Sequence, residues 1–370
     1  MGAAHQPMRP QLTRKKKTGN VAGLEIEAGS IAATEVQGAN GSAQVRASAI
    51  APLAPGVFHE GEVLDPDRLA AALKALFAEH KLGKKVRLGV GNQNVVVRTV
   101  RLPVIEDPKE MEAAVRFRAQ EQIPMPLDQA VLEHQVVGGV AGEDGSAPQV
   151  DVVVVAARRE MVSSFVKPIS DAGLEPVGVD LSAFAMIRAL ADAGLEGGAP
   201  EPGERTSEAV LYCNVGDVTN LAVARGRSCL FTRVSHVGLE SIREALAGTR
   251  GLSVEHAAQW LTYVGLELPV EQIEGDPETV AAARGALEDG VSSLLDELRL
   301  SLDYYGAQEG SLPVERIVLG GAGSAIAGLS QRMEESLGWP IRIGRPPALV
   351  GLGEEAAARL TLSYGLALES

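Results

Sequence analysis

The sequence has 370 residues, which is longer than a single hydrophobic core usually supports, so we expect two domains or two lobes. It contains 48 acidic and 34 basic residues, and the net charge of -14 argues against general binding of nucleic acid or anionic membranes by the folded body. Residues 1–20 are the exception, because they hold five basic residues and no acidic one; their lack of periodicity predicts a disordered, solvated tail, with contact to anionic lipid as the alternative.

Missing signals exclude several common classes of protein. The apolar runs fall short of the about 18 residues of a membrane span, and the N-terminus lacks a signal-peptide core, so a cytoplasmic location is expected. Cys213 and Cys229 lie in apolar strand-like runs and are expected to be buried, reduced thiols. The six histidines show no metal-ligand spacing. Neither a Walker-type glycine loop nor a GxSxG motif is present, which removes the commonest NTPase and hydrolase interpretations.

Two similar segments predict β-hairpins about half a chain apart. Residues 21–36 (VAGLEIEAGSIAATEV) and 209–223 (AVLYCNVGDVTNLAV) each contain an apolar run, a turn with Gly29 or Gly216, and a second apolar run. The repetition favours a duplicated architecture with a cleft between its halves. Two unrelated hairpins in an α/β protein are the alternative.

Strands and one amphipathic helix complete the predicted first lobe. Residues 43–51, 84–91 and 94–102 have the apolar patterns of strands. A helix begins at Asp65-Pro66 and has an apolar face that includes Leu69, Leu73 and Leu76. A helix over 181–190 resumes the lobe, which is expected to comprise residues 21–102 and 181–196.

An inserted unit is predicted over residues 103–180. Its first helix begins at Asp107 and ends before Pro124-Met125-Pro126, with Met111, Val115 or Ala114, and Phe117 expected to face inward. Strands at 130–137 and 150–157, a helix at 159–172 and a strand at 176–179 follow. The unit is therefore expected to be a compact helix-strand-strand-helix-strand subdomain.

The second half of the chain predicts a lobe with a helical cap. A linker rich in Pro, Gly and Glu covers residues 197–206, and a third strand at 228–234 follows the second hairpin. Helices at 239–247, 253–264 and 276–305 form the expected cap, residues 239–305. A strand at 316–319 leads into Gly320-Gly321-Ala322-Gly323, and helices at 326–337 and 354–367 flank a strand at 341–343. Residues 207–238 and 306–370 are expected to form the core of this lobe.

Three segments and the chain ending resemble a known family. They are RFRAQEQIPMPLDQAVLEHQVV at 116–137, SLDYYGAQEG at 301–310, CLFTRVSHVG at 229–238 and the ending SYGLALES. They resemble the PilM family of actin-like type IV pilus assembly proteins, which is related to the cell-division protein FtsA. The resemblance implies an α/β fold of two actin-like lobes (ribonuclease H-like, duplicated), with an inserted SHS2-type α+β subdomain.

The resemblance also implies a nucleotide cleft between the lobes. In the superfamily, backbone amides of the two hairpin turns hold the phosphates, strand-end acids hold magnesium, and a glycine-containing turn lies against the adenosine. The positions of this chain that match are Glu25, Gly29, Ser30, Asn214, Gly216, Thr219, Gly320, Gly321 and Gly323.

Several residues depart from the pattern that nucleotide binding requires. Glu27 stands at a glycine position, Ala32 replaces a lysine, Asn214 replaces an aspartate, and Asp217 stands at a small-residue position. A carboxylate about 4 Å from a phosphate costs on the order of 4 kcal/mol at an effective dielectric constant near 20. That corresponds to roughly three decades of affinity. We therefore expect no cofactor and no enzymatic activity, although the family resemblance leaves ATP with magnesium possible.

Purely structural roles are the alternative at these positions. Glu27 and Asp217 can be turn residues that point to solvent, and the glycines at 320–323 can form a tight turn that needs no ligand. At the nucleoside end, Ala258 and Leu261 stand where the superfamily has Glu and Lys.

The leading functional hypothesis is a cytoplasmic scaffold of the pilus machine. By resemblance, it binds the cytoplasmic tail of a PilN-like inner-membrane protein and couples that protein to the assembly ATPases. The candidate contact residues are Arg116, Phe117 and Gln120, on the first helix of the insert. The alternatives are an ATP-binding switch or slow ATPase, and an FtsA-like membrane tether, which would need a C-terminal amphipathic helix.

Overall fold

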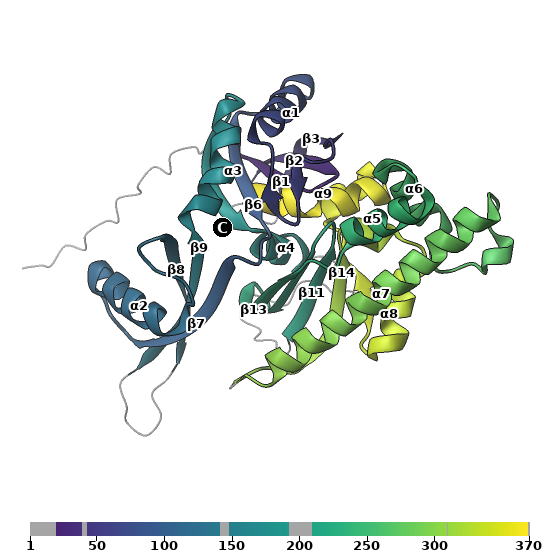
Figure 1. Cartoon of the computed structure of the whole chain (residues 1–370). Coiled ribbons are helices and arrows are strands. Elements are labelled where there is room, and N and C mark those ends of the chain that lie inside the picture. The colour runs from purple at the N-terminus through teal and green to yellow at the C-terminus, as the bar shows by residue number, and fades with distance from the viewer. Residues whose placement is uncertain (1–19, 39–42, 141–147, 192–208, 309, 369–370) are drawn as a thin grey trace, which may run out of the picture.

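The computed structural model describes residues 20–38, 43–140, 148–191, 209–308 and 310–368. The predicted basic tail, apart from its last residue, and the predicted linker lie outside the described residues. Figure 1 shows two sheet-and-helix lobes side by side, with a smaller unit built on β7, β8, β9 and α2 projecting from the first.

The two main sheets repeat one topology, which confirms the predicted duplication. In each, three antiparallel strands are extended by two strands that run parallel to the first. The first sheet has the order β10-β6-β1-β2-β3 (Glu175–Leu181, Lys85–Val90, Ala22–Ile26, Ser30–Gln37, Gln44–Pro52), and the second has the order β13-β12-β11-β14-β15 (Ser228–Ser235, Thr219–Arg225, Ala209–Val215, Val314–Gly320, Ile341–Ile343).

Helices α1 (Pro66–Glu79) and α3 (Arg159–Asp171) cover the first sheet. The side chain of Asp65 caps α1 by accepting from the N–H of Arg68 at 3.0 Å, as expected for an aspartate before a first-turn proline. Phe165 and Ile169 of α3 are fully buried in the core of this lobe. A short hairpin, β4 (Phe58–His59) and β5 (Glu62–Val63), precedes α1.

The inserted unit is a three-stranded sheet covered by one helix. The strand order is β7-β9-β8 (Val95–Pro103, Gln149–Arg158, Ala130–Val140), and α2 (Pro108–Gln122) packs on one face. Helix α2 buries Met111, Val115 and Ala119, which are spaced four residues apart. Phe117 was expected to face inward, but it is 64% exposed. The expectation was wrong because residue 117 lies about 200° around the helix from Val115.

Sheet membership differs from the prediction at both ends of the insert, which was expected to span 103–180. Strand β7 was assigned to the first lobe, but it pairs with β9 in the small sheet. Strand β10 was assigned to the insert, but it pairs in parallel with β6 of the first lobe, against which α3 also packs. An apolar strand pattern shows that a strand is buried but not which sheet buries it.

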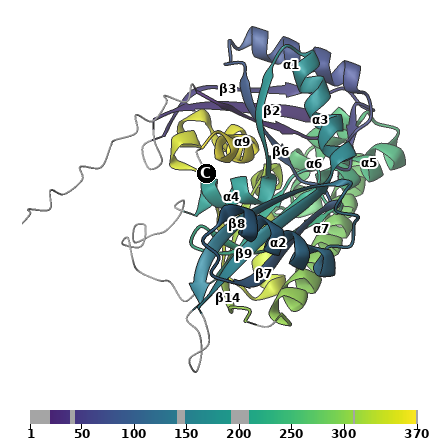
Figure 2. The same cartoon turned by 90° about the vertical axis from the view of Figure 1, so that its left-hand side faces the viewer.

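Helices α4 (Ser182–Leu190) and α9 (Glu354–Ala367) form a layer between the two main sheets (Figure 2). Although α9 ends the second lobe in sequence, it packs on β1 and β2 of the first, while α4 contacts β11 and β12 of the second. The contacts with α9 are close, because a Cβ atom at Gly23 of β1 would overlap with the carbonyl oxygen of Ser363. The lobes therefore share an apolar layer.

Three helices follow β13 close to the residues predicted for the cap. They are α5 (Leu239–Arg250), α6 (Val254–Val264) and α7 (Pro277–Gly306), which share one core with the face of the second sheet that points away from α4 and α9. The remaining short elements are η2 (Val270–Gln272), η3 (Ala322–Ala325), α8 (Leu329–Leu337) and η4 (Pro347–Leu352). Among the described residues, no helix combines the length and the apolar character that a membrane crossing needs, and α7, with 30 residues, carries many charges.

Candidate functional site

The two hairpin turns face each other across a cavity between the lobes. The turn of residues 27–29 joins β1 to β2, and that of residues 216–218 joins β11 to β12. The cavity has a volume of about 620 Å³, which lies in the range of small-molecule sites. Its wall includes Glu27, Gly29, His59, Asp217, Glu240, Arg243, Glu244, Ala258, Leu261 and Arg359.

Each turn donates a backbone amide to a carboxylate of the opposite lobe. The N–H of Gly29 donates to Asp217 Oδ2 at 3.0 Å, and the N–H of Asp217 donates to Glu27 Oε1 at 3.0 Å. Amides in turns of this kind are donors suited to bound anions. Here the anions are side chains of the protein itself, so Glu27 and Asp217 do not point away to solvent.

Gly216 makes room for the Glu27 carboxylate. A Cβ atom at position 216 would overlap with Glu27 Oε1, so this oxygen lies directly against the backbone of the second turn. The space beside Gly216, where the resemblance implied a phosphate, is therefore occupied by the carboxylate.

Arg243 of α5 binds Asp217 from the side of the helical cap. Its guanidinium forms an ion pair with Asp217 Oδ1, and both side chains are largely buried. Helix α5 begins close to the turn, because the N–H of Leu239 donates to the carbonyl of Gly216 at 2.8 Å. Gly238 permits this approach, since a Cβ atom there would overlap with the carbonyl oxygen of Asp217.

Three acidic side chains share the base of the cleft. Burial, followed by the charges of Glu27 and Asp217, raises the pKa of Glu25 well above its usual value. Burial and the charge of Asp217 likewise raise the pKa of Glu27 to about 7, against the opposing influence of Arg243 and Arg359. An additional anion placed here would meet the same repulsion.

A second contact joins the lobes through the β4–β5 hairpin. His59 Nδ1 lies 2.8 Å from Glu240 Oε1, and the N–H of Glu60 donates to Glu240 Oε2 at 3.2 Å. The hydrogen bond with Glu240 raises the pKa of His59, and burial raises the pKa of Glu240. Helix α5 thus contacts the first lobe directly through Glu240 and indirectly through Arg243, whose partner Asp217 accepts from the N–H of Gly29.

Three other predicted nucleotide positions are buried, and two of them form hydrogen bonds within the fold. The hydroxyl of Thr219 donates to the carbonyl of Val237 at 2.7 Å. Ser30 is buried, and its carbonyl accepts from the N–H of Glu27 at 2.8 Å, which closes the first turn. Asn214 is buried too, and within the described part of the chain its Oδ1 has no hydrogen-bond partner.

The glycine turn after β14 packs against the end of β11. Gly320 ends the strand, and Gly321 has φ +79°. A Cβ atom at Gly321 would lie 2.6 Å from the carbonyl oxygen of Val215, and one at Gly323 would lie 2.5 Å from Val215 Cγ1. The close packing alone requires glycine here, which agrees with the interpretation of this motif as a tight turn that needs no ligand.

The wall of the cavity beside α6 and η3 is mixed. The apolar residues Ala258, Leu261, Ala322 and Ile326 line it together with the polar residues Glu255 and Gln259, and neither of the two positions matched to the superfamily, 258 and 261, carries a charge. Ala32, which replaces the family lysine, does not line the cavity; it is buried in the apolar layer between the sheets.

Sequence reasoning missed His59, Glu240 and Arg243. The only local signal was the spacing of Glu240 and Glu244, which places two carboxylates on one face of a helix. Nothing local indicated that this face meets the first lobe, because the partners His59 and Glu240 are 181 residues apart.

The candidate partner residues lie together on α2. Arg116, Phe117 and Gln120 are all exposed, and their spacing of three and four residues places them along one side of the helix. Phe117 therefore presents an aromatic ring to solvent instead of packing in the core.

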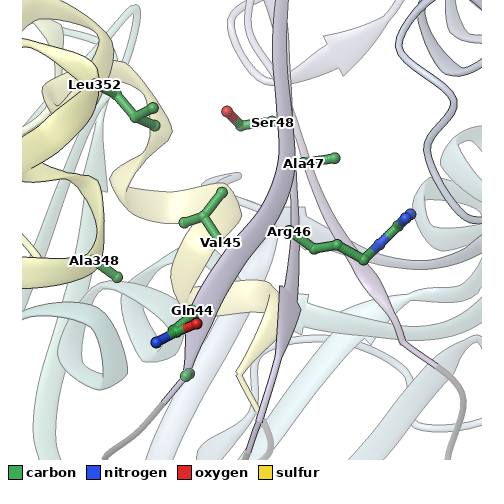
Figure 3. A pocket seen from close by; sticks show the side chains of 8 residues that line it. Gln44, Val45, Arg46, Ala47, Ser48, Ala348 and Leu352 are labelled. Atoms are coloured by element: carbon green, nitrogen blue, oxygen red, sulfur yellow. The ribbon is translucent and has the colours of Figure 1, made fainter.

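A second hollow lies along the edge strand β3, beside η4 (Figure 3). Gln44, Val45, Arg46 and Ser48 line it from the strand, and Leu352 lines it from η4. The guanidinium of Arg46 forms an ion pair with Glu35. Among the described lining residues, Arg46 carries the only charge, so polar groups do not converge here as they do in the cleft.

Comparison with protein families gives one match that covers nearly the whole chain. The model described as type IV pilus assembly protein PilM matches residues 23–370. Among solved structures, a PilM–PilN type IV pilus biogenesis complex shares 28% identity with the chain and has a TM-score of 0.74. That alignment covers 94% of this chain and 97% of the other.

More distant structures show the fold alone. The ethanolamine utilization protein EutJ from Carboxydothermus hydrogenoformans is 15% identical, with a TM-score of 0.51 over 99% of this chain and 92% of that one. MreB5 of Spiroplasma citri, bound to AMPPNP, is 10% identical, with a TM-score of 0.52 over 95% of both chains. Together with the duplicated sheets, these likenesses establish a two-lobed actin-like fold.

Proposed function

The chain belongs to the PilM family of type IV pilus assembly proteins, and we propose that it is an assembly scaffold that binds the cytoplasmic tail of a PilN-like inner-membrane protein. The PilM–PilN complex supports this choice of partner, because the chain is similar to it along almost its whole length. In this proposal the protein is held at the cytoplasmic face of the membrane by its partner and couples that partner to the assembly ATPases.

The exposed side chain of Phe117 is the observation that points to α2 as the surface for tail binding. Helix α2 already buries an apolar stripe formed by Met111, Val115 and Ala119. The core of the inserted unit is therefore formed without the ring of Phe117. Aromatic residues and arginine are enriched in the buried centres of protein interfaces. We infer that Arg116, Phe117 and Gln120 contact the tail.

Binding of a synthetic tail peptide to the purified full chain tests this surface. Phe117→Ala should weaken binding at least about tenfold, the usual effect of truncating an interface aromatic residue. Arg118→Ala is the matched control, because Arg118 is exposed and lies about 160° around α2 from Gln120, so that its loss should leave affinity unchanged. Equal affinity in wild type and Phe117→Ala, with both proteins folded, would refute the assignment of the tail to α2.

We infer further that the cleft is a degenerate nucleotide site that acts as a rigid hinge and not as an active centre. The reciprocal hydrogen bonds support this, because Glu27 and Asp217 already accept from the amides that a phosphate would need. The three neighbouring carboxylates add repulsion toward any polyphosphate. The protein is accordingly proposed to be a pseudo-enzyme.

A nucleotide-dependent switch is the second candidate, and the volume of the cavity favours it. The small and apolar side chains of Ala258, Leu261 and Ile326 leave space beside α6, and this part of the cavity could accept a nucleoside if the carboxylates moved away from the turns. The two functions differ in one observable, which is whether Mg-ATP stabilises the folded chain.

A further inference from the structure

Three potential metal ligands from both lobes converge at the edge of the cleft. His59 Nδ1 lies 2.8 Å from Glu240 Oε1 and 3.9 Å from Glu244 Oε1, and the ligand atoms of the three residues all lie within 4.8 Å of one another. His59 belongs to the β4–β5 hairpin of the first lobe, whereas the two glutamates lie on α5 of the second. All three line the central cavity.

The separations match those that a small divalent ion would impose. With ligands about 2.0–2.1 Å from the ion, neighbouring ligand atoms of a tetrahedral zinc site are about 3.3 Å apart. The separations from His59, 2.8 and 3.9 Å, bracket this value, and the two glutamate oxygens lie no more than 4.8 Å apart, so small movements of the side chains would place the three atoms around one ion.

The surrounding structure holds this group in position. Glu240 and Glu244 are one helical turn apart, so their carboxylates lie on the same side of α5. Glu240 is 6% exposed, and its second oxygen accepts from the N–H of Glu60, which is the kind of outer hydrogen bond that orients a metal-binding carboxylate. Glu244 and His59 are more exposed and can adjust to an ion.

The charges and ligand types select the class of ion. Two carboxylates balance a divalent cation, and an imidazole nitrogen suits zinc and other divalent transition metals, whereas magnesium prefers an all-oxygen shell with several waters. We propose that His59, Glu240 and Glu244 form a zinc-type site that joins the two lobes, with a water from the cavity as the fourth ligand. This site is separate from the α2 surface of the proposed function and does not depend on it.

Titration of Zn²⁺ into the tag-free, EDTA-treated full chain tests the site. We expect one saturable equivalent. His59→Ala and Glu244→Gln should each weaken it at least about tenfold, because loss of a ligand costs no less than the 10–100-fold seen for outer hydrogen-bond partners. Glu255→Gln and His256→Ala are matched controls, since both residues are exposed near the cleft and neither belongs to the cluster. Mg²⁺ at the same concentration should give no binding.

A second measurement asks whether the ion joins the lobes. Hydrogen exchange should slow on Zn²⁺ addition both in residues 58–63 and in the first two turns of α5, and His59→Ala should abolish both effects. Protection of α5 alone would mean that the glutamates bind the ion without the first lobe, and it would overturn the bridge. Absence of saturable binding, or unchanged binding in both His59→Ala and Glu244→Gln, would overturn the site itself.

Discussion

Single side chains decide the state of the cleft, and Glu27 is the clearest case. Its carboxylate accepts a hydrogen bond from the opposite turn, yet burial and Asp217 raise its pKa to about 7 from an ordinary value of 4.5. The folded protein therefore retains a proton that the unfolded chain releases between these two values. By linkage, this group lowers the stability of the fold progressively as the pH rises through that window.

Replacement of this carboxylate by an amide should reverse that loss. The amide side chain introduced by Glu27→Gln does not titrate, but its carbonyl oxygen can still accept from the N–H of Asp217. Glu27→Gln should therefore match wild type near pH 5 and exceed it in stability near pH 8 by on the order of 2 kcal/mol. Denaturant unfolding at both pH values measures the difference, with the exposed Glu267→Gln as control. A stability difference independent of pH would contradict the proposed ionisation.

At the scale of elements, the layer of α4 and α9 joins the lobes through close backbone contact. A Cβ atom at Gly365 of α9 would overlap with the carbonyl oxygen of Ala185 in α4, and one at Gly89 of β6 would lie 2.7 Å from Leu366 Cδ1. These contacts are possible only without side chains, so glycine sets the separation between α9 and its neighbours.

Gly365→Ala should therefore destabilise the protein by about 2 kcal/mol or more, because overpacking at a tight contact forces backbones apart. Gly285→Ala in α7 is the matched control, since a Cβ atom there meets no described atom within 4 Å. That replacement should stabilise by about 0.5–1 kcal/mol, as expected for alanine in a helix interior. Calorimetric or denaturant unfolding measures the free energy of unfolding of both variants. Equal changes in the two would show that α9 does not pack closely against α4.

For the whole molecule, the decisive property is whether a bound ligand or the protein's own side chains connect the two lobes. The described contacts across the cleft come from the protein's own side chains: Asp217 on Gly29, Glu27 on Asp217 and His59 on Glu240. A ligand that binds only the folded state raises its stability by RT ln(1 + [L]/Kd). A cleft filled by carboxylates gives a nucleotide no such gain.

Millimolar Mg-ATP should accordingly leave the melting temperature of the wild-type chain unchanged. Glu27→Gly combined with Asp217→Ser removes both carboxylates from the turns and should allow a measurable shift with Mg-ATP if the cavity beside α6 still accepts a nucleoside. AMP serves as the control, because it lacks the β and γ phosphates. Stabilisation of the wild type by Mg-ATP but not by AMP would replace the pseudo-enzyme proposal with the nucleotide switch.

Local patterns in the sequence predict the individual elements, the repeated hairpins and the family. Helix α1 and the three cap helices follow from apolar periodicity and from capping residues such as Asp65 and Asp276, and these signals act over a few residues. The same signals located the two turns of the cleft and the departures at positions 27 and 217. They failed at Phe117, which was assigned to the buried side of α2 although it lies on the side opposite the apolar stripe.

The sheet that each strand joins and the groups that fill the cleft depend on contacts between distant parts of the chain. Strands β7 and β10 are both apolar, and their partners became known from hydrogen bonding with β9 and β6. The amide of Gly29 and the carboxylate of Asp217 are 188 residues apart, and Glu27 is 190 residues from the amide it binds. Local periodicity reflects which side of an element is buried, whereas the orientation of a side chain across a cleft depends on how distant elements pack.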